Sequence, residues 1–165
     1  MDQGNAFGLV DTYLPQHIMA IRLLIAAMLG AVIGLEREVN TAQAGLRTHI
    51  LVATAATLFT LLAFEIYHSL GEGQDGSKAD PVRVVEAVTA GIAFLGAGAI
   101  YKDGGGVQGI TTGAGMWLAG AVGVATALGY YFLAAGVAGL AVVVMALLRR
   151  FAHGVVRNNG AAAER

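Results

Sequence analysis

Five apolar segments separated by polar connections set the pattern of this sequence. Three are bounded by charged residues, and the last two share a stretch from Gly104 to Leu148 that contains no Asp, Glu, Lys, Arg or His. As a helix this stretch would be about 68 Å long, whereas a membrane core is about 30 Å thick, so it fits two spans with a break near 128–131. We therefore predict membrane-spanning helices at about 17–35, 46–67, 82–101, 110–128 and 131–148.

Lysine and arginine are distributed unequally between the two sides that five spans define. The side with the 36–49 and 102–109 connections and the C-terminal tail carries most of them. Because cytoplasmic connections are enriched in these residues, we predict an N-terminus outside the cell membrane and a cytoplasmic C-terminus. The predicted parts are an N-terminal extracytoplasmic segment (1–16), a membrane domain (17–148) and a short cytoplasmic tail (149–165).

Composition supports the membrane assignment. The 165 residues are 56% hydrophobic and 13% charged, whereas soluble domains average roughly 45–50% and 25%. The absence of cysteine excludes disulfides, thiolate zinc sites and cysteine nucleophiles. A net charge of −1 gives no reason to expect nucleic-acid binding. The predicted fold class is an all-α polytopic membrane helix bundle.

The 24 glycines predict how the helices associate. Lipid tails are as apolar as leucine side chains, so close packing of small residues drives helix association in a bilayer. Gly30 and Gly34 form one GxxxG pair, and Gly109 and Gly113 form another. We expect a tight bundle in which some glycine-rich faces serve a homodimer.

Ionisable residues at the outer ends of the first three spans form one candidate site. Burying an ionisable side chain in a membrane costs free energy, so such residues are candidates for a functional role. Arg22 needs a partner, and Glu65, Asp80 and Glu86 are the available anions. The group is either an ion-pair network that locks three spans together or a polar vestibule for an ion or a lipid headgroup. Its members are Arg22, Glu65, Asp80, Arg83 and Glu86.

A second polar group lies at the cytoplasmic ends of the first and second spans. It is either a set of interfacial anchors or a specific network of carboxylates and guanidinium groups. Its members are Glu36, Arg37, Glu38, Arg47, Thr48 and His49. The sequence offers no catalytic triad or metal-hydrolase motif, so we expect neither an enzyme nor a cofactor, and a metal site stays undetermined.

Five separated sequence blocks resemble the MgtC/SapB family of membrane proteins. They include Gly34-Leu35-Glu36-Arg37-Glu38, Ala44-Gly45-Leu46-Arg47-Thr48-His49 and Asp80-Pro81-Val82-Arg83. They continue in Gly91-Ile92-Ala93-Phe94-Leu95-Gly96-Ala97-Gly98 and Gly109-Ile110-Thr111-Thr112-Gly113, followed by Trp117. The resemblance covers about residues 20 to 125 and marks these positions as characteristic without assigning them chemical roles.

The resemblance implies a multi-pass protein of the bacterial inner membrane. Known members of the family are linked to growth in low magnesium and to virulence through survival inside macrophages, and one is described as restraining ATP synthase. Longer members carry a soluble cytoplasmic domain after the membrane domain. Because only 149–165 follow the last span here, regulatory roles of that domain are not expected of this sequence.

Two functions follow as expectations. The first is a regulatory or interaction protein that binds a second copy of itself or another membrane protein such as ATP synthase. The second is a dimeric transporter or channel for Mg²⁺, another ion or a small solute, because glycine-interrupted spans are typical of transport sites. A partner in pull-downs would support the first function, and flux in vesicles would support the second.

Overall fold

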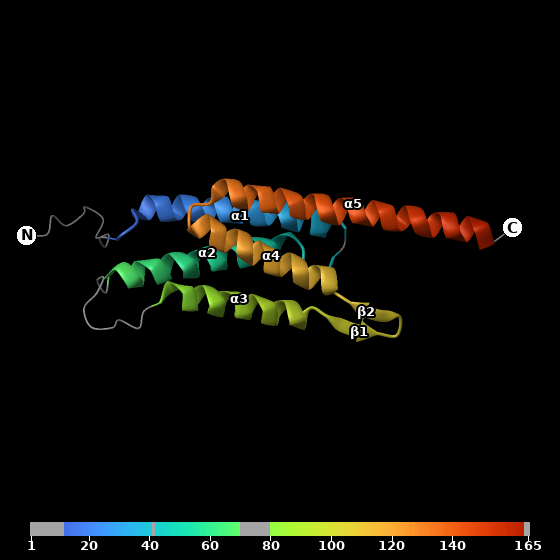
Figure 1. Cartoon of the computed structure of the whole chain (residues 1–165), viewed down its shortest axis with the longest axis horizontal. Helices are drawn as coiled ribbons and strands as arrows, with labels where there is room; N and C mark the ends of the chain where they lie inside the picture. Colours follow the sequence, from blue (N-terminus) through green and yellow to red (C-terminus); the bar gives the residue numbers. More distant parts are fainter. Residues whose placement is uncertain (1–11, 41, 70–79, 164–165) are drawn as a thin grey trace, which may run out of the picture.

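The computed structural model describes residues 12–40, 42–69 and 80–163 as five helices and one β-hairpin (Figure 1). Residues 1–11 of the predicted extracytoplasmic segment and all of residues 70–79 lie outside the described residues. The elements in chain order are α1 Gln16–Val39, α2 Leu46–Ser69, α3 Pro81–Gly98, β1 Tyr101–Asp103, β2 Gly106–Gln108, α4 Ile110–Ala127 and α5 Tyr131–Ala163.

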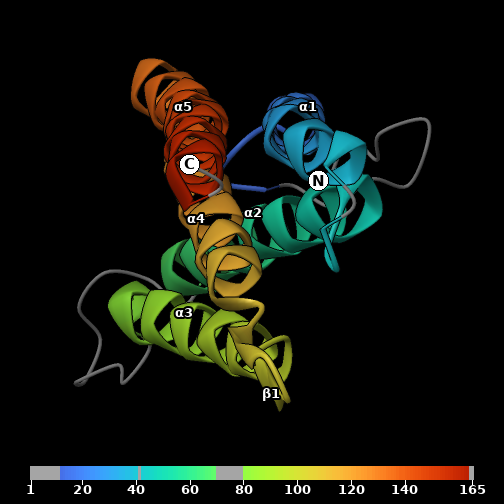
Figure 2. The same cartoon turned by 90° about the vertical axis from the view of Figure 1, so that its right-hand side faces the viewer.

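The helices run up and down along one long axis (Figure 1). We call the end with the α1–α2 connection and the β1–β2 hairpin the hairpin end, and the opposite end, where α1 begins, the amino-terminal end. Viewed along the axis, α2 and α4 occupy the middle, with α1 and α5 on one side and α3 on the other (Figure 2). α3 packs against α4 and α2, whereas α1 packs against α2, α4 and α5.

The lengths of the helices confirm a bundle that can span a membrane. α1 to α4 are each long and apolar enough to cross a bilayer, and α5 contains the shorter apolar segment Tyr131–Leu147. α5 then continues to Ala163, so the helix extends through most of the predicted tail. The protein is therefore an all-α helical membrane bundle, as the hydrophobic pattern predicts.

Glycine brings the central helices into backbone contact. A Cβ atom at Gly30 of α1 would lie 2.6 Å from the His49 carbonyl oxygen of α2, and one at Gly123 of α4 would overlap the Ala53 carbonyl oxygen. The Thr57 hydroxyl bonds the Gly123 carbonyl oxygen at 2.8 Å and thereby joins α2 to α4. Ile33, Val122 and other fully buried apolar side chains fill the space around these contacts.

The segment between the third and fourth spans differs from its prediction. α3 ends at Gly98, three residues before the predicted boundary, and Tyr101–Asp103 pairs antiparallel with Gly106–Gln108. Gly106 and Gly109 adopt φ values of +133° and +86°, which favour glycine, so the chain can turn at these points and enter α4. The result is a two-stranded hairpin at the hairpin end of the bundle (Figure 1).

Candidate functional site

Two pockets with polar side chains open at opposite ends of the interface between α1 and α4. The hairpin-end pocket has a volume of about 430 Å³ and is lined by Arg37 of α1, the α1–α2 connection, β2 and the start of α4. The amino-terminal pocket has a volume of about 290 Å³ and is lined by α1, α2 and the end of α4. Their side chains decide what each end of the bundle can bind.

Arg37 connects three helices at the hairpin end. Its Nη2 donates to the Thr112 hydroxyl of α4 at 3.4 Å, and its Nη1 lies 3.9 Å from the Met145 sulfur of α5. Nη1 is also 3.7 Å from the Glu36 carboxylate, which is a long ion pair. The Arg37 side chain is 13% exposed. This guanidinium therefore lies at the edge of the pocket and ties α1 to α4 and α5.

Glu36 is anchored mainly by its own helix. Asn40, one turn later, donates from Nδ2 to the Glu36 carboxylate at 2.7 Å and to the Glu36 carbonyl oxygen at 2.6 Å. The other carboxylate oxygen of Glu36 and the Nε of Arg37 are buried and have no hydrogen-bond partner among the described residues. Because a buried polar atom without a hydrogen bond costs about 1–3 kcal/mol, the long ion pair with Arg37 Nη1 offsets only part of the cost of burying this Glu36 oxygen.

His49 fills the space between α2 and α4 and is fully buried. Its Nδ1 lies 2.8 Å from the Gly45 carbonyl oxygen, which assigns the proton of a neutral ring to Nδ1. Nε2 has no hydrogen-bond partner within the described part of the chain and faces Gly115, where a Cβ would come within 3.1 Å. Glycine at 115 thus makes room for the ring.

The remaining residues predicted at this end divide into two groups. Glu38 accepts the Leu46 N–H at 2.9 Å and so caps the start of α2. Arg47 is exposed and Thr48 is half-buried, and neither makes a hydrogen bond or ion pair to the described residues. The structure therefore brings Glu36, Arg37, Glu38 and His49 to the α1–α2 connection and leaves Arg47 on the surface.

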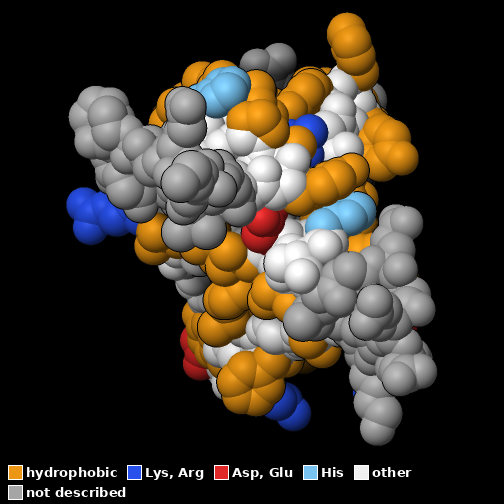
Figure 3. Space-filling view, turned by 90° about the vertical axis from the view of Figure 1, so that its left-hand side faces the viewer, with side chains coloured by type: hydrophobic (Ala, Val, Ile, Leu, Met, Phe, Trp, Pro, Cys, Tyr) orange, Lys and Arg blue, Asp and Glu red, His pale blue; other side chains and the backbone are white. Residues whose placement is uncertain are grey.

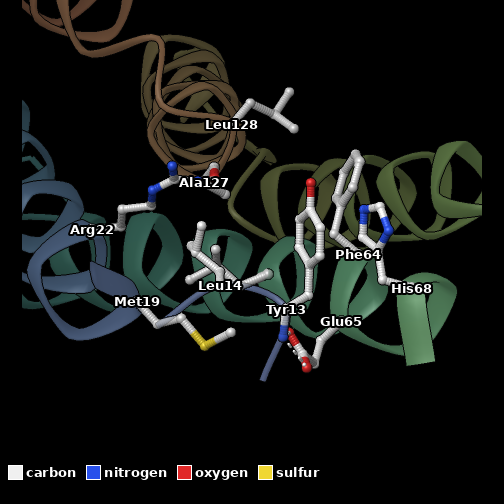
Figure 4. A pocket seen from close by; sticks show the side chains of 10 residues that line it. Tyr13, Leu14, Met19, Arg22, Phe64, Glu65, His68, Ala127 and Leu128 are labelled. Carbon is white, nitrogen blue, oxygen red and sulfur yellow. Dashed lines mark hydrogen bonds between the residues drawn. The ribbon is translucent and has the colours of Figure 1, made fainter. Parts of the chain in front are cut away.

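At the amino-terminal pocket, Arg22 binds the end of α4 rather than a carboxylate (Figure 4). Its guanidinium donates to the Ala127 carbonyl oxygen, and Nε donates to the Tyr131 hydroxyl at 3.2 Å. The last carbonyls of a helix carry partial negative charge, which a cation stabilises. Arg22 therefore joins α1 to the turn between α4 and α5.

Glu65 and His68 of α2 form the other wall of this pocket (Figure 4). The Glu65 carboxylate accepts the Tyr13 N–H at 2.9 and 3.1 Å, and the Tyr13 ring stacks on His68 with centroids 3.5 Å apart. Around the pocket, the amino-terminal end shows isolated charged and histidine side chains among hydrophobic ones (Figure 3). These contacts fix the residues before α1 onto the end of α2.

The predicted outer group is not brought together by ion pairs among its described members. Asp80 caps α3 by accepting the Val82 N–H at 2.9 Å, and Arg83 and Glu86 are exposed on α3. The physical reason is the arrangement of helices, because α1 and α3 lie on opposite sides of the α2–α4 layer (Figure 2). Arg22 on α1 is therefore directed to α4 and α5.

The motif residues of α3 and α4 take different places. Gly96 and Gly113 bring the two helices into contact, since a Cβ at Gly113 would lie 2.9 Å from the Gly96 carbonyl oxygen. Thr112 is buried and Thr111 exposed, while Trp117 is half-exposed and lines an apolar pocket of about 290 Å³ beside α3. A Cβ at Gly91 or Gly98 would meet nothing within 4 Å.

Within the described ranges, no group of three or more His, Asp or Glu residues could hold a metal ion.

The MgtC family model matches residues 23–153, which include the whole hairpin-end pocket and the α2 and α4 parts of the amino-terminal pocket. The chain belongs to the MgtC family. Its relatives include a protein called MgtC from Brucella abortus, 40% identical over 75% of this chain and 48% of the relative. They also include the Salmonella typhimurium protein called MgtC, 39% identical over 67% of this chain and 44% of the relative.

A Haemophilus influenzae protein of uncharacterized function is 30% identical over 79% of this chain and 56% of its own length. This MgtC-family chain thus spans about half the length of the curated relatives it matches. No solved structure matches it significantly.

Three residues that contribute to the hairpin-end site, Asn40, Gln43 and Gln108, are not among the residues predicted from the sequence. Asn40 could have been found, because it stands four residues after Glu36, a spacing that places two side chains on one helix face. Gln43 and Gln108 line the hairpin-end pocket only because the α1–α2 connection and β2 meet there. No local signal in this MgtC-family sequence marks that meeting.

Proposed function

We propose that this MgtC-family chain is a regulatory protein of the bacterial inner membrane that binds another membrane-spanning helix through the outer face of α3. The outer face comprises Ala90, Phe94, Ala97 and Gly98, all of which are exposed. The relatives named MgtC support a protein of this type. The proposed setting is magnesium limitation and virulence-type stress, as the resemblance implies.

The observation that carries the proposal is the shallow packing of α3. Ile92 and Gly96 are its only buried residues, so the helix touches the bundle along one edge. Phe94 projects with 80% of its surface exposed, beside alanines and a glycine at 98 that has open space where a Cβ would be. Small residues let a second helix approach closely, and packing of this kind drives association within membranes.

Site-specific photo-cross-linking in intact bacterial membranes tests this proposal. A photoreactive amino acid replaces Phe94 or Ala97, and matched controls carry it at Leu140 or Val143 of α5, which are comparably lipid-exposed apolar positions. We expect a discrete protein adduct from α3 positions alone. Its mass distinguishes a second copy of this 16.9 kDa chain from another protein, such as a membrane subunit of ATP synthase. Equal adducts from α5, or lipid adducts alone, would refute the proposal.

The placement of the two pockets favours a second candidate function, transport of Mg²⁺, another ion or a small solute. Both pockets adjoin the α1–α4 interface, at opposite ends of the bundle. Fully buried Ile33 and Val122 fill the core between them, so transport would require helix movement. Flux into vesicles that is lost in Arg22→Ala and Arg37→Gln, but kept in Arg83→Gln, would favour this candidate. Vesicles that pass none of the ions tested would eliminate it for those ions.

A further inference from the structure

A long apolar groove lies between α2 and α3, next to the outer face of α3. Its volume is about 550 Å³, and every side chain that lines it is apolar. Val52, Ala56 and Ile92 are buried and form its floor, while Leu51 and Leu95 are more than half exposed at its rim. Since both helices are long and apolar enough to span a membrane, the groove opens to acyl chains rather than to water.

The groove is open because small residues line its middle. Ala55 of α2 and Ala87 of α3 have only a methyl group, and Gly91 has no side chain. A Cβ at Gly91 would meet nothing within 4 Å, so the bundle itself does not fill this space. The groove is therefore open because α2 and α3 carry small residues where they face each other.

The dimensions of the groove fit one acyl chain. Its lining extends from Leu51 to Phe59 on α2, about 12 Å, and from Val84 to Leu95 on α3, about 16 Å. One leaflet contributes about 15 Å of hydrocarbon, half of the membrane core. A transmembrane helix crosses both leaflets, about 30 Å, so it is about twice as long as the groove.

A free positive charge stands near one end of this groove. Arg47 precedes Leu51 by one helical turn, about 6 Å closer to the hairpin end along α2. It is exposed and has no hydrogen bond or ion pair to the described residues. A guanidinium group matches the geometry of a phosphate, and a long arginine side chain can extend toward the membrane interface while its stem stays among apolar groups.

We infer that the α2–α3 groove binds an anionic phospholipid, with one acyl chain along Gly91 and the phosphate at Arg47. The groove can bind the acyl chain and Arg47 can bind the phosphate of one lipid, which would lie in the leaflet at the hairpin end. The acyl chain supplies most of the contact, and the charge pair supplies the preference for an anionic headgroup. The bound lipid would then fix the spacing between α3 and α2.

Native mass spectrometry of the full chain in detergent tests the inference, with dioleoyl phosphatidylglycerol and dioleoyl phosphatidylcholine as probes. We expect one tightly bound lipid and about tenfold tighter binding of phosphatidylglycerol, because its net negative charge is not offset by a headgroup ammonium as that of phosphatidylcholine is. Arg47→Gln should remove this preference. Arg83→Gln, which removes an exposed arginine at the opposite end of the bundle, should keep it.

A second pair of variants tests the groove itself. Gly91→Leu places a side chain in the groove and should weaken the binding of both lipids about tenfold or more, because it excludes the acyl chain from its contact surface. Gly136→Leu, also at a position where a Cβ meets nothing, should bind both lipids as the original chain does. Unchanged thermal unfolding, followed by Trp117 fluorescence, shows that each variant is folded.

Three results would overturn the inference. They are full lipid binding by Gly91→Leu, a retained headgroup preference in Arg47→Gln, and a lipid-free dimer that dissociates when Gly91 is replaced by leucine. The last result would assign the groove to a second copy of the chain. The cross-linking test at Phe94 measures protein adducts and this test measures lipid affinity, so failure of the proposed function and failure of this lipid site are distinguishable.

Discussion

Replacing Gly123 with alanine should force α2 and α4 apart. The new Cβ would overlap the Ala53 carbonyl oxygen and lie 3.0 Å from the Ala56 Cβ, and backbone atoms cannot yield as a flexible side chain can. Overpacking of this kind costs about 1–3 kcal/mol. The Thr57 bond to the Gly123 carbonyl oxygen would lengthen from 2.8 Å, which costs about 0.6 kcal/mol more for a hydrogen bond between membrane helices.

The higher helix propensity of alanine offsets part of this loss, by up to about 1 kcal/mol. We therefore expect a net loss of about 2 kcal/mol, which is about 30-fold in the unfolding equilibrium constant. Unfolding by increasing SDS in mixed micelles measures it, and Trp117, the only tryptophan of the chain, reports on α4 directly.

Gly139→Ala is the matched control for this variant. A Cβ at Gly139 meets nothing within 4 Å, so the substitution should leave stability unchanged or raise it by up to about 1 kcal/mol through helix propensity. If Gly123→Ala proves as stable as Gly139→Ala, the close α2–α4 contact does not hold the bundle together, and the packing argument fails.

Three further predictions concern polar contacts. Arg37→Met should lower the free energy of unfolding by about 3 kcal/mol in the same SDS titration, because it leaves Glu36 buried without its cation; unchanged stability would show that the long ion pair contributes nothing. Glu38→Ala should cost about 1 kcal/mol by removing the acceptor for the Leu46 N–H, whereas Glu38→Gln retains an oxygen there and should cost less; equal losses would contradict the capping role. Asp80→Ala should speed hydrogen exchange at Val82 by about fivefold, while Asp80→Asn keeps the cap and the slow rate; equal rates in both variants would refute it.

The bundle is predictable from the sequence because membrane thickness fixes how long each apolar segment must be. Hydrophobic length alone predicts five helices that begin within one residue of the observed positions, although α5 continues 15 residues beyond its predicted end. The hairpin is not predictable in this way, since its strands have three exposed residues each and carry no apolar alternation. Its turn depends on glycines that also suit an ordinary loop.

The partner of Arg22 illustrates a limit of reading charges along a chain. The sequence directs the search to carboxylates, but the partner is the Ala127 carbonyl oxygen at the end of α4. Such carbonyls lack partners within their helix and attract cations, and no side chain marks them in the sequence. Glycines show a similar limit, because Gly30 and Gly91 look alike in the sequence although one touches a backbone and the other faces open space.

The position of α3 also constrains how the protein is assembled during synthesis. In the sequence α3 comes between α2 and α4, but in space it lies to one side of them (Figure 2). The Thr57 hydroxyl of α2 donates to a carbonyl oxygen of α4 and not of α3. The α1–α2 pair can associate as soon as both helices are inserted, whereas α3 finds only its smaller contact, with α2, until α4 supplies the Gly113 contact. A nascent chain that stops before α4 therefore exposes the surfaces of α1, α2 and α3 that α4 covers in the completed bundle.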